Sequence, residues 1–272
     1  MAHERAGKRA QESDLIDVDA VLSAYHDISP DPSNPDQMGV FGTSGHRGSS
    51  LDGAFNDAHI AATTQAIVEY RTCQGIDGPL FIGKDTHALS MPAWTTAIEV
   101  LCANDVEVIA EHDDEWTPTP AVSRAIIVHN RLSEGRQADG IVVTPSHNPP
   151  RDGGFKYNPP HGGPADTDAT GWIADRANEL LADPSAIRRK PYEQVRDEVS
   201  RYDYRSAYCD DLRNAIDLDA IDEAGVHIGA DPLGGASVSY THLRAHETRE
   251  DRGFRGVGGK KKGGGGGGGG GG

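Results

Sequence analysis

The stretch GIVVTPSHNPPRDGGFKYNPP, residues 140–160, begins as a buried strand and then becomes abruptly polar. Its first five residues, 140–144, are nearly all apolar, which is the composition of a strand covered on both faces. Such strands are typical of layered α/β folds, in which helices pack on both sides of a mainly parallel sheet. Ser146 follows two residues beyond this predicted strand, between Pro145 and Pro149.

Predicted helices and strands alternate around this stretch. Short apolar runs at 79–83 and 106–110 predict two further strands. Apolar residues at helical spacing predict four helices, which begin near Asn56, Ser90, Thr119 and Asp168. The sequence therefore predicts an α/β fold, with a layered α/β/α domain around a mainly parallel sheet.

The C-terminal part of the chain changes character. A helix is predicted near 206–216, and VHIGADPLGG (226–235) predicts a strand that ends in a glycine-rich turn. Beyond about Ser237 the apolar periodicity stops, and the chain closes with three lysines and ten glycines. We expect this tail to be non-native and disordered, the alternative being a genuine basic, flexible tail. The expected parts are an N-terminal extension with a first helix, the layered domain, the truncated start of a second α/β domain, and the tail: 1–40, 41–195, 196–237 and 238–272.

Composition limits the classes of partner. The net charge of −16 argues against nucleic acid as the main partner. The 12 histidines show no zinc-binding spacing such as HExxH. Cys73, Cys102 and Cys209 are odd in number and far apart, as expected of buried thiols in a reducing compartment. No apolar run is long enough to cross a membrane, and the N-terminus lacks a signal-peptide core. These features predict a cytoplasmic globular protein with no membrane partner.

Ser146 is the candidate reactive group. Ligands of open α/β sheets bind beyond the carboxyl ends of the strands. The two prolines restrict the loop, which lowers the entropy lost in presenting a hydroxyl as a nucleophile or group carrier. The alternative is an ordinary Ser/Pro turn. A Ser-His hydrolase fits poorly, because G-x-S-x-G is absent and the side chain of His147 should point away from that of Ser146. His147 is expected to touch the transferred group or the substrate, or to be structural.

Two other segments predict cations beside Ser146. FGTSGHRG, residues 41–48, surrounds Arg47 with glycines and hydroxyls, and such a segment suits an anion such as phosphate. Lys156 follows Ser146 by ten residues, and a turn at Gly153–Gly154 would fold it back towards the serine. A partly buried lysine near other cations has a lowered pKa and can transfer protons, the alternative being a solvated surface lysine.

Taken together, FGTSGHRG, GKDTHALS, TPTPAVS, ADGIVVTPSHNPPRDGGFKYNPP and GGPADT resemble the bacterial phosphoglucomutases of the α-D-phosphohexomutase superfamily. The resemblance covers roughly residues 17–235. It implies a four-domain enzyme that interconverts glucose 1-phosphate and glucose 6-phosphate, with glucose 1,6-bisphosphate as intermediate and activator.

The resemblance also implies roles for single residues. Ser146 would be phosphorylated and would hold Mg²⁺ through a phosphate oxygen, Arg47 would hold the phosphoryl group, and Lys156 would be the general acid/base. His147 is counted with these catalytic residues. The expected substrate-binding residues are Thr43, Ser44, Gly45, His46 and Asn148.

Parts of the family pattern are missing. No D-x-D-x-D run, the family's metal loop, occurs in the sequence, and the sugar-recognition and distal phosphate-binding loops are also absent. We therefore expect a truncated chain with no measurable mutase turnover by itself. The alternatives are a non-catalytic sugar-phosphate-binding or scaffold protein and a phosphomannomutase-type hexose mutase. Nothing in the sequence indicates an oligomeric state.

Overall fold

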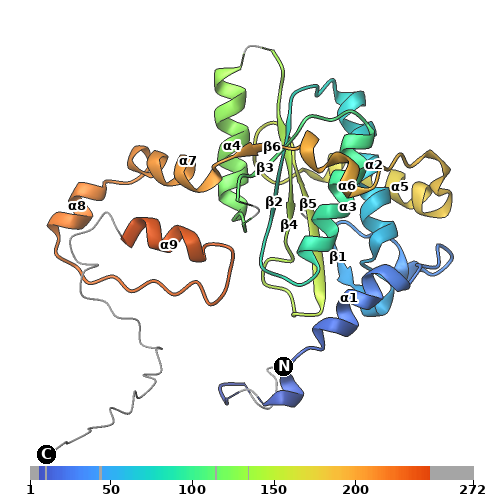
Figure 1. Cartoon of the computed structure of the whole chain (residues 1–272), viewed down its shortest axis with the longest axis horizontal. Coiled ribbons are helices and arrows are strands. Elements are labelled where there is room, and N and C mark those ends of the chain that lie inside the picture. Colours follow the sequence, from blue (N-terminus) through green and yellow to red (C-terminus); the bar gives the residue numbers. More distant parts are fainter. Residues whose placement is uncertain (1–5, 10, 43–44, 114, 134, 246–272) are drawn as a thin grey trace, which may run out of the picture.

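A six-stranded sheet lies at the centre of the structure, a computed structural model that describes residues 6–9, 11–42, 45–113, 115–133 and 135–245 (Figure 1). The strands are β1 Gly45–Ser49, β2 Leu80–Lys84, β3 Val108–Glu111, β4 Asp139–Val143, β5 Asp152–Asn158 and β6 Ser200–Tyr202. Their order in the sheet is β1-β5-β4-β2-β3-β6. β5 is antiparallel to both of its neighbours, while the pairs β4–β2, β2–β3 and β3–β6 are parallel. The predicted mainly parallel sheet is confirmed.

Helices cover both faces of this sheet, as predicted for an α/β/α domain (Figure 1). They are α1 Val18–Asp27, α2 Asp57–Gln74, α3 Ser90–Ala103, α4 Thr119–Leu132, α5 Thr167–Ala182, α6 Tyr192–Val195, α7 Tyr204–Asp211, α8 Leu218–Glu223 and α9 Val238–Ala245. One apolar cluster joins the sheet to α2, α3 and α5, and includes Ile82, Ile141 and Phe155. A second cluster joins the opposite face to α4 and α7 through Phe81 and Val142.

Capping residues explain where the long helices begin and end. Asn56 and His59 form a capping box at the start of α2, and Gly75 ends that helix in the left-handed conformation. Asp166 caps α5 by accepting a hydrogen bond from the backbone N–H of Ala169. Ser90 and Thr119, expected as caps, are instead the first residues of α3 and α4. The predicted helix starts are therefore displaced by one or two residues.

Three strands, β1, β5 and β6, were not foreseen, and the first two matter for the site. The segment expected to be only an anion-binding loop contains β1, and the segment expected to turn at Gly153–Gly154 is the continuous strand β5. These strands pair with each other, with Arg47 opposite Gly154 and Gly45 opposite Lys156. The chain reverses before β5 instead, in residues 144–151, which we call the serine loop.

The C-terminal part also differs from expectation. β6 extends the sheet beyond residue 195 by pairing with β3, and α7 packs against α4. No strand forms at 226–235, where Val226 and Ile228 are exposed and have no neighbouring strand to pair with. The expectation that nothing beyond Ser237 packs is wrong for α9, because Tyr240 is 7% exposed and contacts the ring of Tyr208. The rest of the expected tail, 246–272, lies outside the described residues.

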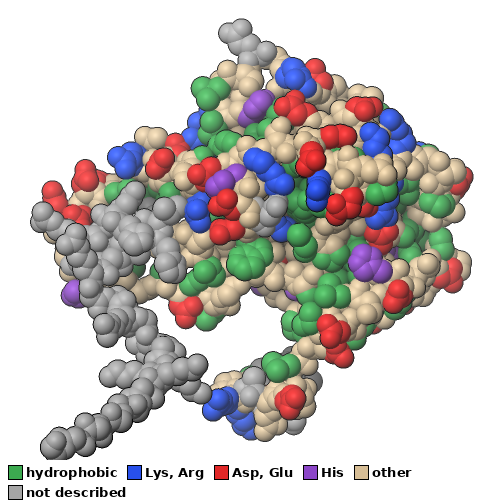
Figure 2. Space-filling view, viewed as in Figure 1, with side chains coloured by type: hydrophobic (Ala, Val, Ile, Leu, Met, Phe, Trp, Pro, Cys, Tyr) green, Lys and Arg blue, Asp and Glu red, His purple; other side chains and the backbone are tan. Residues whose placement is uncertain are grey.

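Acidic and basic side chains are interspersed over the face shown in Figure 2. Ion pairs join distant segments of the chain, such as those of Arg189 with Asp57 and Glu99 at 2.5 and 2.6 Å. Among the helices that the structure describes, none combines the length and the apolar character of a membrane-spanning segment.

Candidate active site

The serine loop joins β4 to β5 and presents Ser146 at its tip. Ser146 is exposed and has a φ of 64°, in the left-handed region that few residues other than glycine adopt. Its backbone N–H donates to Oγ1 of Thr144 across 3.0 Å. Because such a conformation costs free energy, it persists only where surrounding contacts enforce it. The structure therefore confirms a constrained turn and adds a strained residue at its tip.

Lys156 of β5 contacts Ser146 directly. Its Nζ donates a hydrogen bond to Oγ of Ser146 across 2.5 Å. Burial lowers the pKa of Lys156, the nearby positive charge of Arg47 lowers it further, and the negative charge of Asp85 opposes both effects. A lysine with a lowered pKa in hydrogen-bond contact with a hydroxyl is suited to exchange a proton with it.

Arg47 lies on the same face of the sheet as Lys156. In the β1–β5 ladder Arg47 pairs with Gly154, and residues paired across a ladder share a face. The Nε atom of Arg47 is buried and has no hydrogen-bond partner among the described residues. Because a buried guanidinium N–H without a partner is costly, this arrangement suits a bound anion.

Gly154 allows the serine loop to lie close to β5. A Cβ atom on Gly154 would lie 2.2 Å from the carbonyl oxygen of Thr144 and 2.5 Å from Cα of Pro145. Both of these are backbone atoms, which cannot move aside as the end of a side chain can. Gly154 therefore sets how closely the loop, and with it Ser146, approaches the strand that carries Lys156.

A cleft of about 370 Å³ opens beside Ser146. Its walls include Asp85 and Thr86, which follow β2, Thr144, which follows β4, and Thr117, which precedes α4. These residues all lie at the carboxyl end of the parallel strands, where ligands of open α/β sheets bind. The Oγ1 atom of Thr117 is buried without a hydrogen-bond partner among the described residues. The cleft thus offers polar groups to a small polar ligand.

Sequence reasoning did not single out most of these wall residues. Asp85, Thr86 and His87 belong to GKDTHALS, directly after the predicted strand at 79–83. The rule that placed Ser146 at a strand end applies equally to them, since parallel strands end at one edge. The signal was therefore present in the order of the elements.

The described residues around Ser146 do not make up a ligand set for Mg²⁺. This ion prefers six oxygen ligands in a nearly octahedral arrangement. Asp85 supplies the one carboxylate among the described residues that line the cleft. Its Oδ1 already accepts hydrogen bonds from the backbone N–H of His87 and from Oγ of Ser90, at 2.9 and 2.5 Å. A phosphate on Ser146 would add oxygens but no second carboxylate.

Of the other residues expected in the site, only some lie near the cleft. Asn148 lines the cleft and donates from Nδ2 to Asp152 across 3.2 Å. His147 is exposed and lies outside the cleft wall. His46 was expected to bind the substrate, but its placement contradicts this. Its side chain is 1% exposed, and its ring stacks on those of Phe55 and His59. Burial lowers the pKa of His46 to about 4. Thr43 and Ser44 lie outside the described residues.

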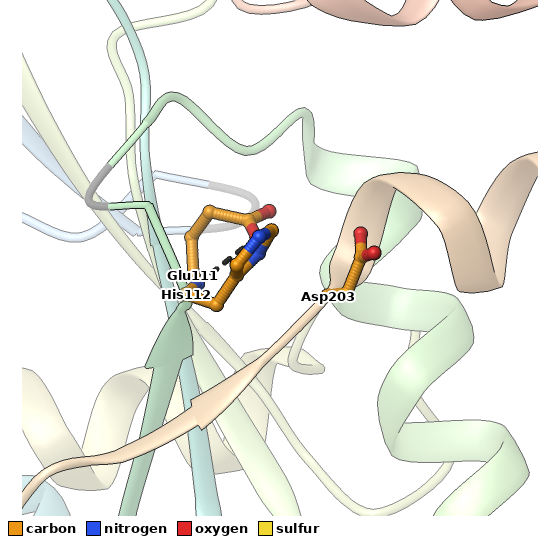
Figure 3. A group of neighbouring side chains, drawn as sticks. All are labelled: Glu111, His112 and Asp203. Carbon is orange, nitrogen blue, oxygen red and sulfur yellow. Dashed lines mark hydrogen bonds and ion pairs between the residues drawn. The ribbon is translucent and has the colours of Figure 1, made fainter.

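A group of metal-ligand type, Glu111, His112 and Asp203, lies at the ends of β3 and β6 (Figure 3). Nδ1 of His112 is 2.8 Å from Glu111, and its Nε2 is 3.0 Å from Asp113. Asp203 accepts the backbone N–H of Ser206 and caps α7. The group is therefore explained by the pairing of His112 with Glu111 and Asp113 and by the role of Asp203 as a helix cap.

Comparisons with known proteins agree with this fold. Residues 38–183 match the family model described as phosphoglucomutase/phosphomannomutase, alpha/beta/alpha domain I. The chain is 52% identical over 238 residues to a phosphoglucomutase of Komagataeibacter xylinus, a match that covers 86% of this chain and 43% of that protein. It is 33% identical over 121 residues to the cytoplasmic phosphoglucomutase of Mesembryanthemum crystallinum, covering 43% of this chain and 21% of that protein.

A solved structure gives the same picture of the fold. The open form of the exocytosis-sensitive phosphoprotein parafusin, a phosphoglucomutase from Paramecium, aligns with a TM-score of 0.63 and 21% identity. That alignment covers 79% of this chain and 41% of the Paramecium chain. The chain therefore spans less than half the length of each of these relatives.

Proposed function

Because the chain belongs to the phosphoglucomutase/phosphomannomutase family, we propose that Ser146 accepts and donates the phosphoryl group in a transfer between hexose phosphates. The observation that carries this proposal is the contact between Ser146 Oγ and Lys156 Nζ, on a strained loop with Arg47 on the same face. A hydroxyl that carries a phosphoryl group needs exact positioning, a proton-transfer partner and positive charge nearby.

Each side chain has a defined task in this proposal. When phosphorylated Ser146 gives its phosphoryl group to a sugar hydroxyl, the bond from phosphorus to Oγ breaks and a bond to the sugar oxygen forms. Lys156 donates a proton to the departing Oγ, while the sugar hydroxyl releases its own proton to water. In the reverse step Lys156 takes the proton of Oγ and water returns one to the departing sugar oxygen. Arg47 faces the phosphoryl oxygens with its guanidinium, which stabilises the charge that spreads over them.

We propose glucose phosphates as the substrates. The support is the 52% identity to a protein named phosphoglucomutase. The reaction would interconvert glucose 1-phosphate and glucose 6-phosphate through phosphoserine and a glucose 1,6-bisphosphate intermediate. A phosphomannomutase-type specificity is compatible with the family match, and a direct comparison of glucose and mannose bisphosphates as phosphoryl donors separates the two.

We also propose a reducing, cytoplasmic setting. Its support is that Cys73 and Cys102 form no disulfide in the structure, although of these two only Cys102 is buried as expected and Cys73 is exposed. Mg²⁺ is carried over from the family resemblance as an expectation, since the residues around Ser146 do not form its site.

Phosphorylation of Ser146 tests the function. The purified chain is incubated with glucose 1,6-bisphosphate, and intact mass and peptide mapping locate any added phosphate. We expect one phosphate on Ser146, its loss in Ser146→Ala, and its retention in Ser185→Ala, which removes an exposed hydroxyl after α5. Phosphate on another residue, or none, contradicts the proposal. Binding of the sugar phosphate with no transfer to Ser146 favours the non-catalytic binding protein.

A further inference from the structure

His87 connects the serine loop to a distant part of the chain. It lies in the turn between β2 and α3, and its Nε2 is 2.7 Å from the carbonyl oxygen of Pro150. Pro150 precedes β5 and belongs to the serine loop. The hydrogen bond therefore spans 63 positions of sequence and joins the edge of the cleft to the segment that carries Ser146.

The two hydrogen bonds of the His87 ring determine which of its nitrogen atoms carries the hydrogen. The backbone N–H of Leu89 donates to Nδ1 of His87 across 3.1 Å, so Nδ1 carries no hydrogen. The carbonyl of Pro150 can only accept, so Nε2 must carry the hydrogen. His87 is thus neutral, in one tautomer, with both nitrogens used by backbone groups. The backbone N–H of His87 is itself held by Asp85, which fixes the turn from which the ring projects.

The serine loop depends on contacts of this kind. Pro149 and Pro150 have no N–H, so this part of the loop cannot donate backbone hydrogen bonds. On the other side, Arg151 reaches Ser49 across 3.4 Å and pairs with Asp52. That ion pair is substantially exposed and therefore weak. The bond from His87 holds the loop from the cleft side, where Ser146 keeps its unfavourable φ.

We propose that His87 is a positioning residue that holds the serine loop through Pro150 and thereby keeps Ser146 beside Lys156. The part of this inference that concerns phosphoryl transfer rests on the proposed function. The part that concerns the loop rests only on the geometry.

Two variants separate the hydrogen bond from the remainder of the ring. His87→Gln places an amide N–H near the former Nε2, within reach of Pro150. His87→Asn places its polar atoms near the former Nδ1, so it can keep the bond from Leu89 but cannot reach Pro150. The first readout is amide hydrogen exchange of the peptide 144–152, which includes the N–H groups of Ser146 and Asp152. Exchange in α5 serves as the reference for global unfolding. The second readout is the rate of Ser146 phosphorylation by glucose 1,6-bisphosphate.

We expect His87→Asn to speed exchange in 144–152 by about fivefold, the factor for one net hydrogen bond. Exchange in α5 should not change, and His87→Gln should stay within about twofold of the original chain. Phosphorylation of Ser146 should slow more in His87→Asn than in His87→Gln.

Equal exchange rates in both variants, or an exchange rate in α5 that rises as much as that of 144–152, overturns the positioning role. If both variants lose phosphorylation without faster exchange, His87 acts on the ligand and the inference is wrong. If the original chain shows no phosphorylation but the exchange pattern holds, the proposed function fails while the positioning of the loop stands.

Discussion

The Nζ atom of Lys156, a residue of β5, lies 2.5 Å from Oγ of Ser146, at the tip of the serine loop that joins β4 to β5. The ladder between β4 and β5 places Lys156 opposite Val142, so a single hairpin carries both residues. The proton partner of the candidate phosphoryl carrier is therefore supplied by the same supersecondary unit.

Replacement of Lys156 tests its role in proton transfer. Lys156→Met should slow phosphorylation of Ser146 by roughly 10²- to 10⁴-fold, the usual contribution of general acid–base catalysis. Lys156→Arg keeps the positive charge but cannot release a proton near neutral pH, so it should also be slow. The measurement is the time course of phosphate incorporation by intact mass. A Lys156→Arg variant as fast as the original chain would show that only the charge matters.

The pKa of Lys156 should respond to its two charged neighbours with opposite signs. Arg47→Gln removes a positive charge that favours loss of the proton, so the pKa of Lys156 should rise. Asp85→Asn removes the negative charge that opposes this effect, so the pKa should fall further. A pH titration of the Lys156 ¹³Cε chemical shift measures both. Shifts of the same sign in the two variants would contradict the electrostatic arrangement.

Gly154 should not tolerate a side chain. Gly154→Ala places a methyl group against the backbone of Thr144 and Pro145, and we expect a loss of roughly 1–3 kcal/mol in the free energy of unfolding. Gly171→Ala is the control, because Gly171 lies in α5 with no atom within 4 Å of the added Cβ. That variant should gain up to about 1 kcal/mol. Denaturant unfolding of both variants gives the comparison, and equal effects would rule out the close approach.

Stability should fall in mild acid because of His46. The folded chain binds a proton on His46 only near pH 4, since burial lowers its pKa to about 4. The unfolded chain binds that proton near pH 6.5, so between these values the unfolded state holds more protons and stability falls as pH falls. The difference between these two pKa values corresponds to roughly 3 kcal/mol.

His46→Phe should remove this part of the pH dependence while keeping the ring stack on Phe55. The control is His161→Gln, which replaces an exposed histidine. Denaturant unfolding from pH 4 to pH 8 provides the measurement. An unchanged slope in His46→Phe would mean that other groups cause the acid instability.

The elements that could be predicted are those with a strong apolar pattern. β2, β3 and β4 follow from short apolar runs, and α2 follows from helical spacing between Asn56 and Gly75. β1 could not be found in this way, because GHRGS contains no apolar alternation. Its strand conformation comes from pairing with β5 and from packing of His46 on Phe55. Conversely, residues 226–230 have strand-like composition but no strand beside them.

The same reasons limited prediction of the site. Residue type and spacing were enough to select Ser146, Arg47 and Lys156. The contact of Lys156 with Ser146 was also predicted, but from a turn at 153–154 that does not form. The left-handed conformation of Ser146 could not be anticipated, since it depends on contacts that close around the loop. The burial of the His46 side chain was missed because His46 belongs to β1 and that strand was not predicted.

The alternation of side chains along β5 restricts which insertions and deletions this strand can tolerate. Lys156 points to the serine loop, while its neighbours Phe155 and Tyr157 are fully buried on the other face. Loss or gain of one codon between Asp152 and Lys156 would exchange these faces, placing an ammonium group in the apolar core and an aromatic ring beside Ser146. Changes of two codons would preserve the alternation. In a library of in-frame deletions within β5, survivors should therefore favour even lengths.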